Sequence, residues 1–311
     1  MLVAEQKQTE RKLWKNNRKK LEAIRFNSLS DYEKKKGYAN RLDYVLPFLT
    51  WGLKVSGAYY FGKKNAQKVK VKHFELEFDR LPAAFDGYKI LHLTDLHIDS
   101  LPGLEEVICQ QLQGLNYDSC FITGDYRMKL MGEYNDEVLS PLRDIIACIQ
   151  PEDGIYATLG NHDTYGIVEP LEAMGVRVLT NESVRLRKGS ESILLTGLDD
   201  PHFYYTHHAL SALDTKDDDF KIALVHSPEL SYEAAERGYD FYLCGHTHAG
   251  QVCLPSGIPL ITHLKKANEF YKGFWKAGEM QGYTSSGCGV SGIPVRFNTE
   301  GEICLFTLKR K

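Results

Sequence analysis

Short apolar runs recur along the chain from about residue 69 onward, and each ends in turn-forming or polar residues. Residues 69–78 (VKVKHFELEF) alternate between apolar and polar positions, the period of a strand with one buried face. The later runs are apolar at consecutive positions, which indicates strands that are buried on both faces. These runs are residues 88–94, 119–123, 154–160, 177–180, 192–197, 220–225 and 240–245.

Helical patterns separate several of these runs, at residues 103–115, 137–149, 168–174 and 228–238. Strands that alternate with helices predict a layered α/β architecture. Residues 301–309 (GEICLFTLK) read as a returning antiparallel strand, whereas the first 64 residues predict helix and irregular structure. We therefore place a domain boundary near residues 62–68, between an N-terminal basic and aromatic, mainly helical extension (1–65) and a main domain (66–311).

Polar residues follow five of the apolar runs, at the carboxyl ends of the predicted strands. Open α/β sheets place their ligand sites at this rim. In chain order, the residues are Asp95 and His97, then Asp125, then Asn161, His162 and Asp163, then His226, and finally His246 and His248.

This set combines carboxylate, amide and imidazole groups and contains no thiolate, which suits divalent first-row metal ions better than a structural zinc site. Seven candidate ligands are more than one ion needs, and a carboxylate such as Asp125 can bridge two ions. Glycines precede Asp125, Asn161 and His246, as expected where a strand turns sharply and its backbone passes close to an ion. The candidate ligands are Asp95, His97, Asp125, Asn161, His226, His246 and His248.

Each motif is ambiguous when taken alone. Asp95 and His97 could be a turn aspartate beside a core histidine, and Gly-Asn-His-Asp could be an ordinary turn. However, five of the eleven histidines fall in these motifs, each directly after a strand-like run. The combined order and placement favour a metal site.

The series D-x-H, G-D, G-N-H-D, H and G-H-T-H resembles that of the calcineurin-like metallophosphoesterases, and the resemblance covers about residues 70–311. Residues 81–99, 245–255 and 291–308 look most like bacterial single-domain phosphodiesterases of the family, a subgroup that includes UDP-2,3-diacylglucosamine pyrophosphatase-like enzymes. The resemblance implies a four-layer αββα sandwich, in which two mixed β-sheets are flanked by helices. It also implies hydrolysis of phosphoester bonds with two divalent ions.

Carried over to this chain, the resemblance assigns roles to the motif residues. Asp95, His97 and His248 would hold the first ion, and Asp125 would bridge. Asn161, His226 and His246 would complete the second site. His162 would act on the substrate as a catalytic residue, with Asp163 orienting it; the alternative is a merely structural His162. We expect Mn²⁺, with Zn²⁺ or Fe²⁺ as alternatives.

The chain departs from the family pattern after the bridging aspartate. Many relatives read G-D-x-x-D, whereas here Gly124-Asp125 is followed by Tyr-Arg-Met-Lys with no second acid. Arg127 and Lys129 in this segment either reach a second phosphate of the substrate or belong to a solvated loop. Residues 199–218 are long and aromatic enough to form a lid over the pocket.

The resemblance and the N-terminal extension together suggest a lipid-linked diphosphate, such as UDP-2,3-diacylglucosamine, as substrate. One alternative is a phosphodiesterase of soluble nucleotides, and an alternative of another class is a metal-binding scaffold without turnover. A net charge of −3 argues against broad nucleic-acid binding. The expected partners are therefore a phosphorylated small molecule or lipid, and the sequence leaves the oligomeric state open.

Composition also bears on location. The seven cysteines are odd in number and lack C-x-x-C spacing, so we expect neither a disulfide framework nor a thiolate zinc site. With no apolar signal at the N-terminus, this predicts a cytoplasmic protein.

Residues 45–61 are too short and too interrupted, by Lys54 among others, for a transmembrane helix. Residues 7–25 carry eight basic and two acidic residues, so they either lie on the anionic inner face of a membrane or form a helix packed on the main domain.

Overall fold

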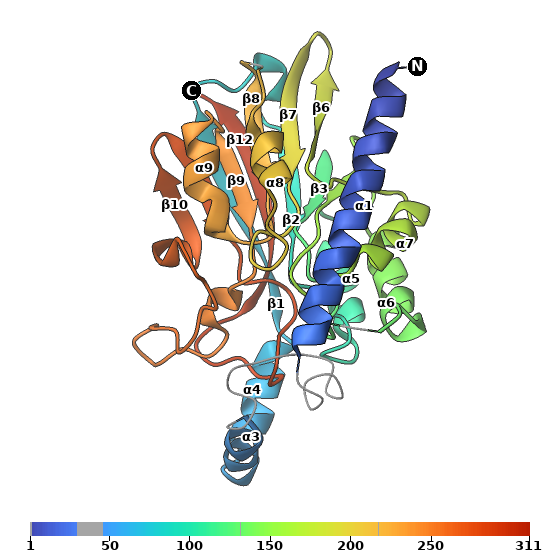
Figure 1. Cartoon of the computed structure of the whole chain (residues 1–311). Helices are drawn as coiled ribbons and strands as arrows, with labels where there is room; N and C mark the ends of the chain where they lie inside the picture. Colours follow the sequence, from blue (N-terminus) through green and yellow to red (C-terminus); the bar gives the residue numbers. More distant parts are fainter. Residues whose placement is uncertain (1, 30–45, 131, 217) are drawn as a thin grey trace.

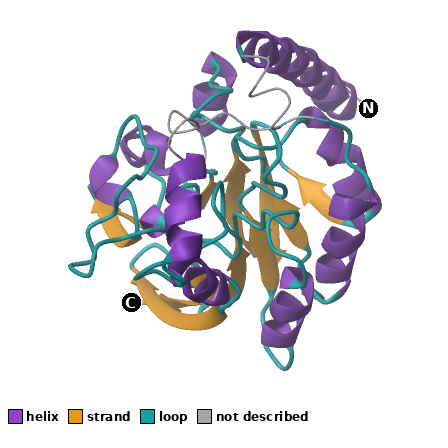
Figure 2. Cartoon of the chain, turned by 90° about the horizontal axis from the view of Figure 1, so that it is seen from below, coloured by secondary structure: helices purple, strands orange, loops and turns teal. Residues whose placement is uncertain are grey.

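Two six-stranded β-sheets face each other in a computed structural model that describes the chain except residues 1, 30–45, 131 and 217 (Figure 1). Helices cover the outer face of each sheet, and Figure 2 shows them around the periphery with the strands in the centre. The expected four-layer αββα sandwich of mixed sheets is confirmed.

The strands of the first sheet lie in the order β1 (Val69–Phe78), β12 (Gly301–Arg310), β2 (Lys89–Leu93), β3 (Ser119–Ile122), β4 (Ile155–Ala157) and β5 (Val176–Val178). Those of the second lie in the order β10 (Gly273–Ala277), β11 (Met280–Thr284), β9 (Phe241–Cys244), β8 (Phe220–Leu224), β7 (Glu191–Gly197) and β6 (Glu182–Lys188). The returning strand β12 is antiparallel to β2, as predicted, and also parallel to β1. The strands β6, β10 and β11 have no counterpart among the runs read from the sequence.

The helices form two outer layers and a projection. The described helices are α1 (Leu2–Ser28), α3 (Leu46–Val55), α4 (Ala58–Ala66), α5 (Leu104–Leu112), α6 (Asp136–Ala147), α7 (Val168–Ala173), α8 (His207–Leu213) and α9 (Ser231–Glu236). Helices α5, α6 and α7 cover the first sheet, and α8 and α9 cover the second (Figure 1). None of the described helices is both long enough and apolar enough to cross a membrane.

Successive side chains of β2 pack into two different hydrophobic clusters, one on each face of the sheet. Leu91 and Leu93 point into the cluster beneath α5, α6 and α7, whereas Ile90 points into the cluster between the sheets. All three side chains are fully buried. A strand with a core on each face must be apolar at successive positions, which explains the runs that marked these strands in the sequence.

The topology brings particular chain segments to one end of the sandwich. Because β12 runs antiparallel to β2, the start of β12 at Gly301 lies near the carboxyl end of β2. The start of β1 at Val69 pairs with Gly301 and therefore lies at the same end. Helices α4 and α3 precede β1 and project from this end of the molecule (Figure 1).

One cysteine prediction is wrong. Cys109 on α5 and Cys148 at the end of α6 form a disulfide across two packed helices, with their Cα atoms 5.8 Å apart. Their separation of 39 residues gives no local signal, because the pairing depends on how the two helices pack. The cysteine pattern therefore no longer supports the expectation of a reducing compartment. The five other cysteines are free and buried.

Candidate active site

The polar residues after the strands converge at one end of the two sheets. Asp95 and His97 follow β2, Asp125 follows β3, and Asn161 follows β4 in the first sheet. His226 follows β8, and the pair His246 and His248 follows β9 in the second sheet. The seven predicted ligands therefore come from both sheets, and all are buried.

Two groups of potential metal ligands form where these strand ends meet. Asp95, His97 and His248 supply atoms that all lie within 4.8 Å of one another, and Asp125, His226 and His246 form a second such group. This division agrees with the assignment implied by the family resemblance.

Asp125 lies between the two groups. Its Oδ2 is 3.5 Å from His97 Nε2 and 3.2 Å from His226 Nε2. Asn161 joins the second group, with its Oδ1 3.0 Å from His226 Nε2 and 2.7 Å from His246 Nδ1. The carboxylate is thus placed to bridge two ions, and the amide oxygen to complete the second site.

Backbone carbonyls set the orientation of two of the histidine rings. His97 Nδ1 donates to the carbonyl of Arg127 at 3.0 Å, and His226 Nδ1 donates to the carbonyl of Thr123 at 2.7 Å. A carbonyl can only accept, so the opposite nitrogen, Nε2, is left with a lone pair when the ring is neutral. This arrangement is typical of metal-binding histidines.

The donor chemistry fits divalent cations. Around His226 Nε2, the neighbouring Asp125 Oδ2 and Asn161 Oδ1 can only accept, so a positive charge must lie among the three. Burial alone would lower the pKa of His226, but the negative charges of Asp125 and Asp95 have the larger effect and raise it to about 10. The surroundings of this ring therefore stabilise a positive charge. Within the part of the chain that is described, the buried His246 Nε2 and His248 Nδ1 have no hydrogen-bond partner.

The backbone at the ligands is unusual. Five of the seven have a positive φ, from 39° at His97 to 75° at His246, a conformation that non-glycine residues rarely adopt and that concentrates at functional sites. The neighbouring glycines are needed for close packing: a Cβ on Gly160 would overlap the Asp125 carboxylate, and one on Gly245 would overlap that of Asp95. The predicted lack of room for a Cβ is confirmed at these two glycines, and the space is occupied by ligand carboxylates.

Residues 88–250, more than half of the chain, match the family model for calcineurin-like phosphoesterases. An uncharacterized metallophosphoesterase of Helicobacter pylori is 30% identical, the alignment covering 85% of this chain and 71% of the relative. The chain belongs to the calcineurin-like phosphoesterase family. The uncharacterized metallophosphoesterase YkoQ of Bacillus subtilis is 27% identical (78% of this chain, 92% of the relative), and a Danio rerio "transmembrane protein with metallophosphoesterase domain" is 29% identical (80% and 60%). Among solved structures, a 5'-nucleotidase precursor from Thermus thermophilus is 14% identical with a TM-score of 0.44, over 71% of this chain and 54% of that one.

Membership of this family makes the protein a metal-dependent phosphoesterase, a hydrolase, and the two ligand groups form a dinuclear divalent-metal site.

His162 lies beside the phosphoesterase centre, with its ring 4.9 Å from that of His97. Its Nδ1 donates to the carbonyl of Met128, so Nε2 is the nitrogen left for a substrate. Burial lowers the pKa of His162 to about 3, and the ring is therefore neutral before an anion binds.

Asp163 has a different role from the one expected. Its carboxylate accepts hydrogen bonds from the backbone N–H groups of Asp125 (2.7 Å), Tyr126 (3.0 Å) and Gly160 (2.7 Å). The expected contact with the His162 ring is replaced by the bond from that ring to Met128. Asp163 thus connects the turn after β3 to the turn after β4, and it positions Asp125 rather than the His162 ring.

In this structure, Arg127 and Lys129 both contact other protein residues. Arg127 is only 1% exposed, donates to the carbonyl of Gly132 at 2.8 Å and stacks on Tyr134. Lys129 pairs with Glu137 on the surface at 3.0 Å. These contacts turn the Arg127 side chain inward, which its sequence position does not reveal. Its contribution to the site is the carbonyl that orients His97.

Helix α1 packs on the phosphoesterase domain, so the second alternative for residues 7–25 holds. Arg18 is buried and donates to the carbonyl of Asp163 at 2.6 Å while forming an ion pair with Asp199. Arg25, two helical turns later, donates to the carbonyl of Asn161 and to Tyr204. The sequence analysis missed both arginines; their spacing of seven, which puts them on one helix face, was the available signal.

The expected lid segment (199–218) lies beside the second ligand group. His202 is nearly buried, its ring centroid is 4.6 Å from that of His246, and its Nδ1 is 3.1 Å from Glu229. Phe203 stacks on the guanidinium of Arg25, which also donates to the carbonyl of Asn161. This segment and α1 therefore meet next to the turn that carries Asn161. Within the segment, residues 207–213 form α8, whose His207 and His208 are exposed.

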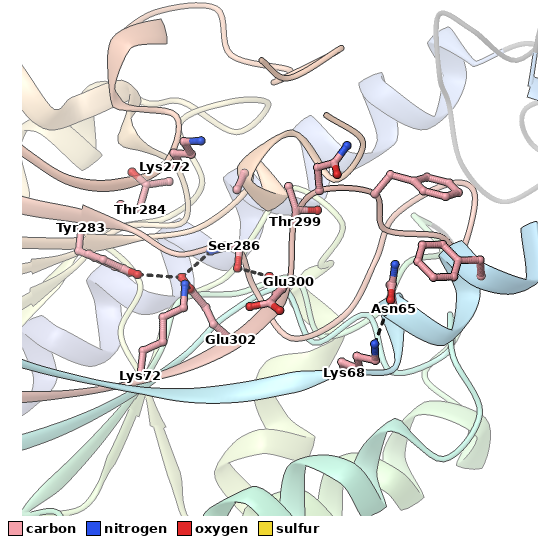
Figure 3. Close-up of a pocket in the computed structure, with 15 residues that line it drawn as sticks. Asn65, Lys68, Lys72, Lys272, Tyr283, Thr284, Ser286, Thr299, Glu300 and Glu302 are labelled. Carbon is pink, nitrogen blue, oxygen red and sulfur yellow. Dashed lines mark hydrogen bonds and ion pairs between the residues drawn. The ribbon is translucent and has the colours of Figure 1, made fainter. Parts of the chain in front are cut away.

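A cavity of about 710 Å³ lies next to this site, beside β1, β11 and β12 (Figure 3). Figure 3 shows Lys72 and Tyr283 converging on Glu302, whose carboxylate also accepts from the backbone N–H of Ser286. None of the seven metal ligands lines this cavity. The cavity is therefore separate from the dinuclear centre, although Ala249, the neighbour of His248, contributes to its wall.

Proposed function

We propose that the protein is a phosphodiesterase or pyrophosphatase that cleaves a lipid-linked diphosphate, such as UDP-2,3-diacylglucosamine, at a peripheral position on a membrane. The observation that carries the proposal is a half-buried arginine, Arg25, beside the Asn161 turn of the metal centre. A second phosphate needs a cation next to the reacting one. We assign this role to Arg25, because Arg127 is buried and Lys129 pairs with Glu137.

The contacts of Arg25 suit this role. Its Nη1 is engaged by the carbonyl of Asn161 and by Tyr204, and its plane stacks on Phe203 at 3.7 Å. These contacts fix the orientation of the guanidinium. Among the described residues, no hydrogen-bond partner engages its other two nitrogens, which can therefore bind a ligand. A guanidinium presents a planar pair of donors that matches two phosphoryl oxygens.

The chemistry then divides between the ions and the chain. When bound, the ions polarise the phosphoryl oxygens and make water more acidic. His162 offers Nε2 to the reacting phosphoryl group, because its Nδ1 is fixed on Met128. The approach of an anion raises the pKa of a neutral imidazole, which lets His162 hold a proton for the departing oxygen.

For the ions themselves we propose Mn²⁺, with Zn²⁺ and Fe²⁺ as alternatives. The mixed set of imidazole, carboxylate and amide donors supports a first-row ion of intermediate softness. A membrane setting is supported by the name of the Danio rerio relative, which describes that protein as transmembrane.

The first test compares bis-p-nitrophenyl phosphate with p-nitrophenyl phosphate, each with manganese, zinc or no added metal. We expect metal-dependent cleavage of the diester, with the monoester much slower. Cleavage of the monoester alone would overturn the diesterase proposal, and no cleavage with any metal would favour a scaffold without turnover.

The second test offers UDP-2,3-diacylglucosamine in detergent micelles and, in parallel, the soluble UDP-N-acetylglucosamine, which has the same diphosphate without acyl chains. We expect a kcat/KM that is higher for the lipid by roughly tenfold or more, because acyl chains add apolar binding surface. Equal values would overturn the lipid assignment and favour the soluble nucleotide phosphodiesterase.

A further inference from the structure

Helices α3 and α4 expose large apolar side chains to solvent. Phe48 is 76% exposed and Trp51 67%, although side chains of this size are normally buried. The two helices project from the body of the molecule, so nothing else in the described chain covers them (Figure 1). The exposed apolar residues on them are Phe48, Leu49, Trp51, Val55, Tyr60 and Phe61.

A second apolar segment lies next to the base of these helices. The loop 252–261 exposes Leu254, Ile258, Leu260 and Ile261. Cys253 N donates to the carbonyl of Phe297 at 2.9 Å, and the Phe297 ring stacks on Phe61 of α4. The loop and the helices are therefore neighbours through residue 297, and together we call them the apolar end surface.

The apolar end surface adjoins the metal centre. Arg296 N donates to the carbonyl of Gly62 on α4 at 3.0 Å, and the guanidinium of Arg296 donates to the carbonyl of His248 at 3.3 Å. One residue thus connects the base of the projecting helices to a predicted metal ligand. The loop 252–261 follows His248 directly in the chain, so the surface and the centre share one end of the sandwich.

Charge on this surface is one-sided. Residues 46–74 contain no Asp or Glu, and neither do residues 241–268. Lys54, Lys63 and Lys64 lie on the two helices, and Lys266 follows the loop. The neighbouring Lys265 instead donates to the carbonyl of His202. The chain as a whole carries a net charge of −3, so this segregation of cations with exposed aromatic and aliphatic side chains is local.

We infer that the apolar end surface docks on an anionic lipid bilayer and holds the metal centre against the membrane. Apolar and aromatic side chains enter the interface while lysines remain at the level of the anionic headgroups. Helix α3, with 10 residues, is about 15 Å long, which suits insertion into one leaflet rather than crossing. The inference deepens the lipid-linked substrate proposed above: a headgroup at the bilayer surface would reach the ligands directly.

The test is co-sedimentation of the full-length protein with vesicles of phosphatidylcholine alone or of equal parts phosphatidylcholine and phosphatidylglycerol. We expect binding to the mixed vesicles that weakens in high salt. The double variant Phe48→Ser/Trp51→Ser should lose at least roughly tenfold in partition constant. The control is Tyr232→Ser, which changes an exposed aromatic residue on α9, away from this surface, and this variant should bind like the wild type.

Cleavage of soluble bis-p-nitrophenyl phosphate by the same preparations separates docking from catalysis, and the double variant should retain it. Docking is overturned if the wild type does not co-sediment with anionic vesicles, or if the double variant binds them as well as the wild type does. It is also overturned if light scattering shows a wild-type dimer that the double variant abolishes, since a second copy would then cover this surface. Vesicle binding without cleavage of the lipid substrate would refute the substrate and leave docking standing.

Discussion

Arg18 of helix α1 donates a hydrogen bond of 2.6 Å to the carbonyl of Asp163, 145 residues away in the chain. The same guanidinium forms a buried ion pair with Asp199. Asp163 in turn accepts the backbone N–H of the bridging Asp125. The N-terminal helix therefore supports the turns that carry the metal ligands, and is part of the site rather than an appendage.

Arg18→Ala should destabilise the protein by about 3–5 kcal/mol, because it leaves the Asp199 carboxylate buried without its partner. Urea unfolding measures the change. The matched control is Lys15→Ala on the same helix, whose partner Glu169 is largely exposed; little change is expected there. Equal effects of the two variants would show that Arg18 does not hold α1 in place.

His162→Ala should lower kcat for bis-p-nitrophenyl phosphate by roughly 100- to 10,000-fold while both ions remain bound. The reason is that His162 contacts Asp125 only through its backbone N–H, which alanine keeps. Steady-state kinetics and elemental analysis measure the two quantities, and the exposed His208→Ala serves as control. Loss of metal from His162→Ala would instead make His162 a ligand.

Asp125→Asn should remove both ions, since the carboxylate lies between the two ligand groups. Elemental analysis should find little metal, and thermal unfolding should become insensitive to EDTA, which lowers the Tm of the wild type because ions that bind only the folded state stabilise it. Asp153→Asn, which changes a carboxylate that accepts from Tyr88, should leave metal content unchanged. Retention of one ion per chain in Asp125→Asn would contradict bridging.

Arg25→Ala should raise KM for a diphosphate substrate by about tenfold or more, the loss expected for a charged hydrogen bond, and leave KM for bis-p-nitrophenyl phosphate nearly unchanged. The diester probe has no second phosphate for Arg25 to bind. Arg11→Ala, on the same helix but paired with Glu172, is the control. An equal fall in kcat with both substrates would mean that Arg25 only supports the Asn161 turn.

Glu302 should contribute to acid sensitivity. Burial alone would raise its pKa, but Lys72 and the N–H of Ser286 hold the pKa below its ordinary value of 4.5. A lowered carboxyl pKa stabilises the folded state above the unfolded value, and this stabilisation is lost as the pH falls below 4.5. Urea unfolding in EDTA should therefore show a shallower acid decline for Glu302→Gln than for the wild type.

The half-exposed neighbour Glu300, which pairs with Lys70, provides the comparison. Glu300→Gln should follow the wild-type curve, because exposed ion pairs contribute little to stability. If Glu302→Gln declined as steeply as the wild type, the Glu302–Lys72 pair would not be a source of acid sensitivity.

The metal-ligand groups could be predicted from the sequence because they depend on regular features. Apolar runs marked β2, β3, β4, β8 and β9, and parallel strands of a layered fold place their carboxyl ends at one rim. Asp95 and Asp125 therefore had to come near one another once the strands were recognised, whereas the arrival of His246 also depends on how the second sheet packs on the first. Their glycine neighbours carried a further signal, since a Cβ at Gly160 or Gly245 would overlap a ligand carboxylate.

Only the tertiary structure decided the remaining features, because they depend on contacts between segments that are distant in the chain. The burial of Arg127 against Tyr134 follows from the tertiary structure, and the packing of α5 on α6 paired Cys109 with Cys148. Local pattern reports which side of an element is apolar, but it does not report which other element covers that side. For the same reason, the sequence alone could not place Arg25 beside Asn161.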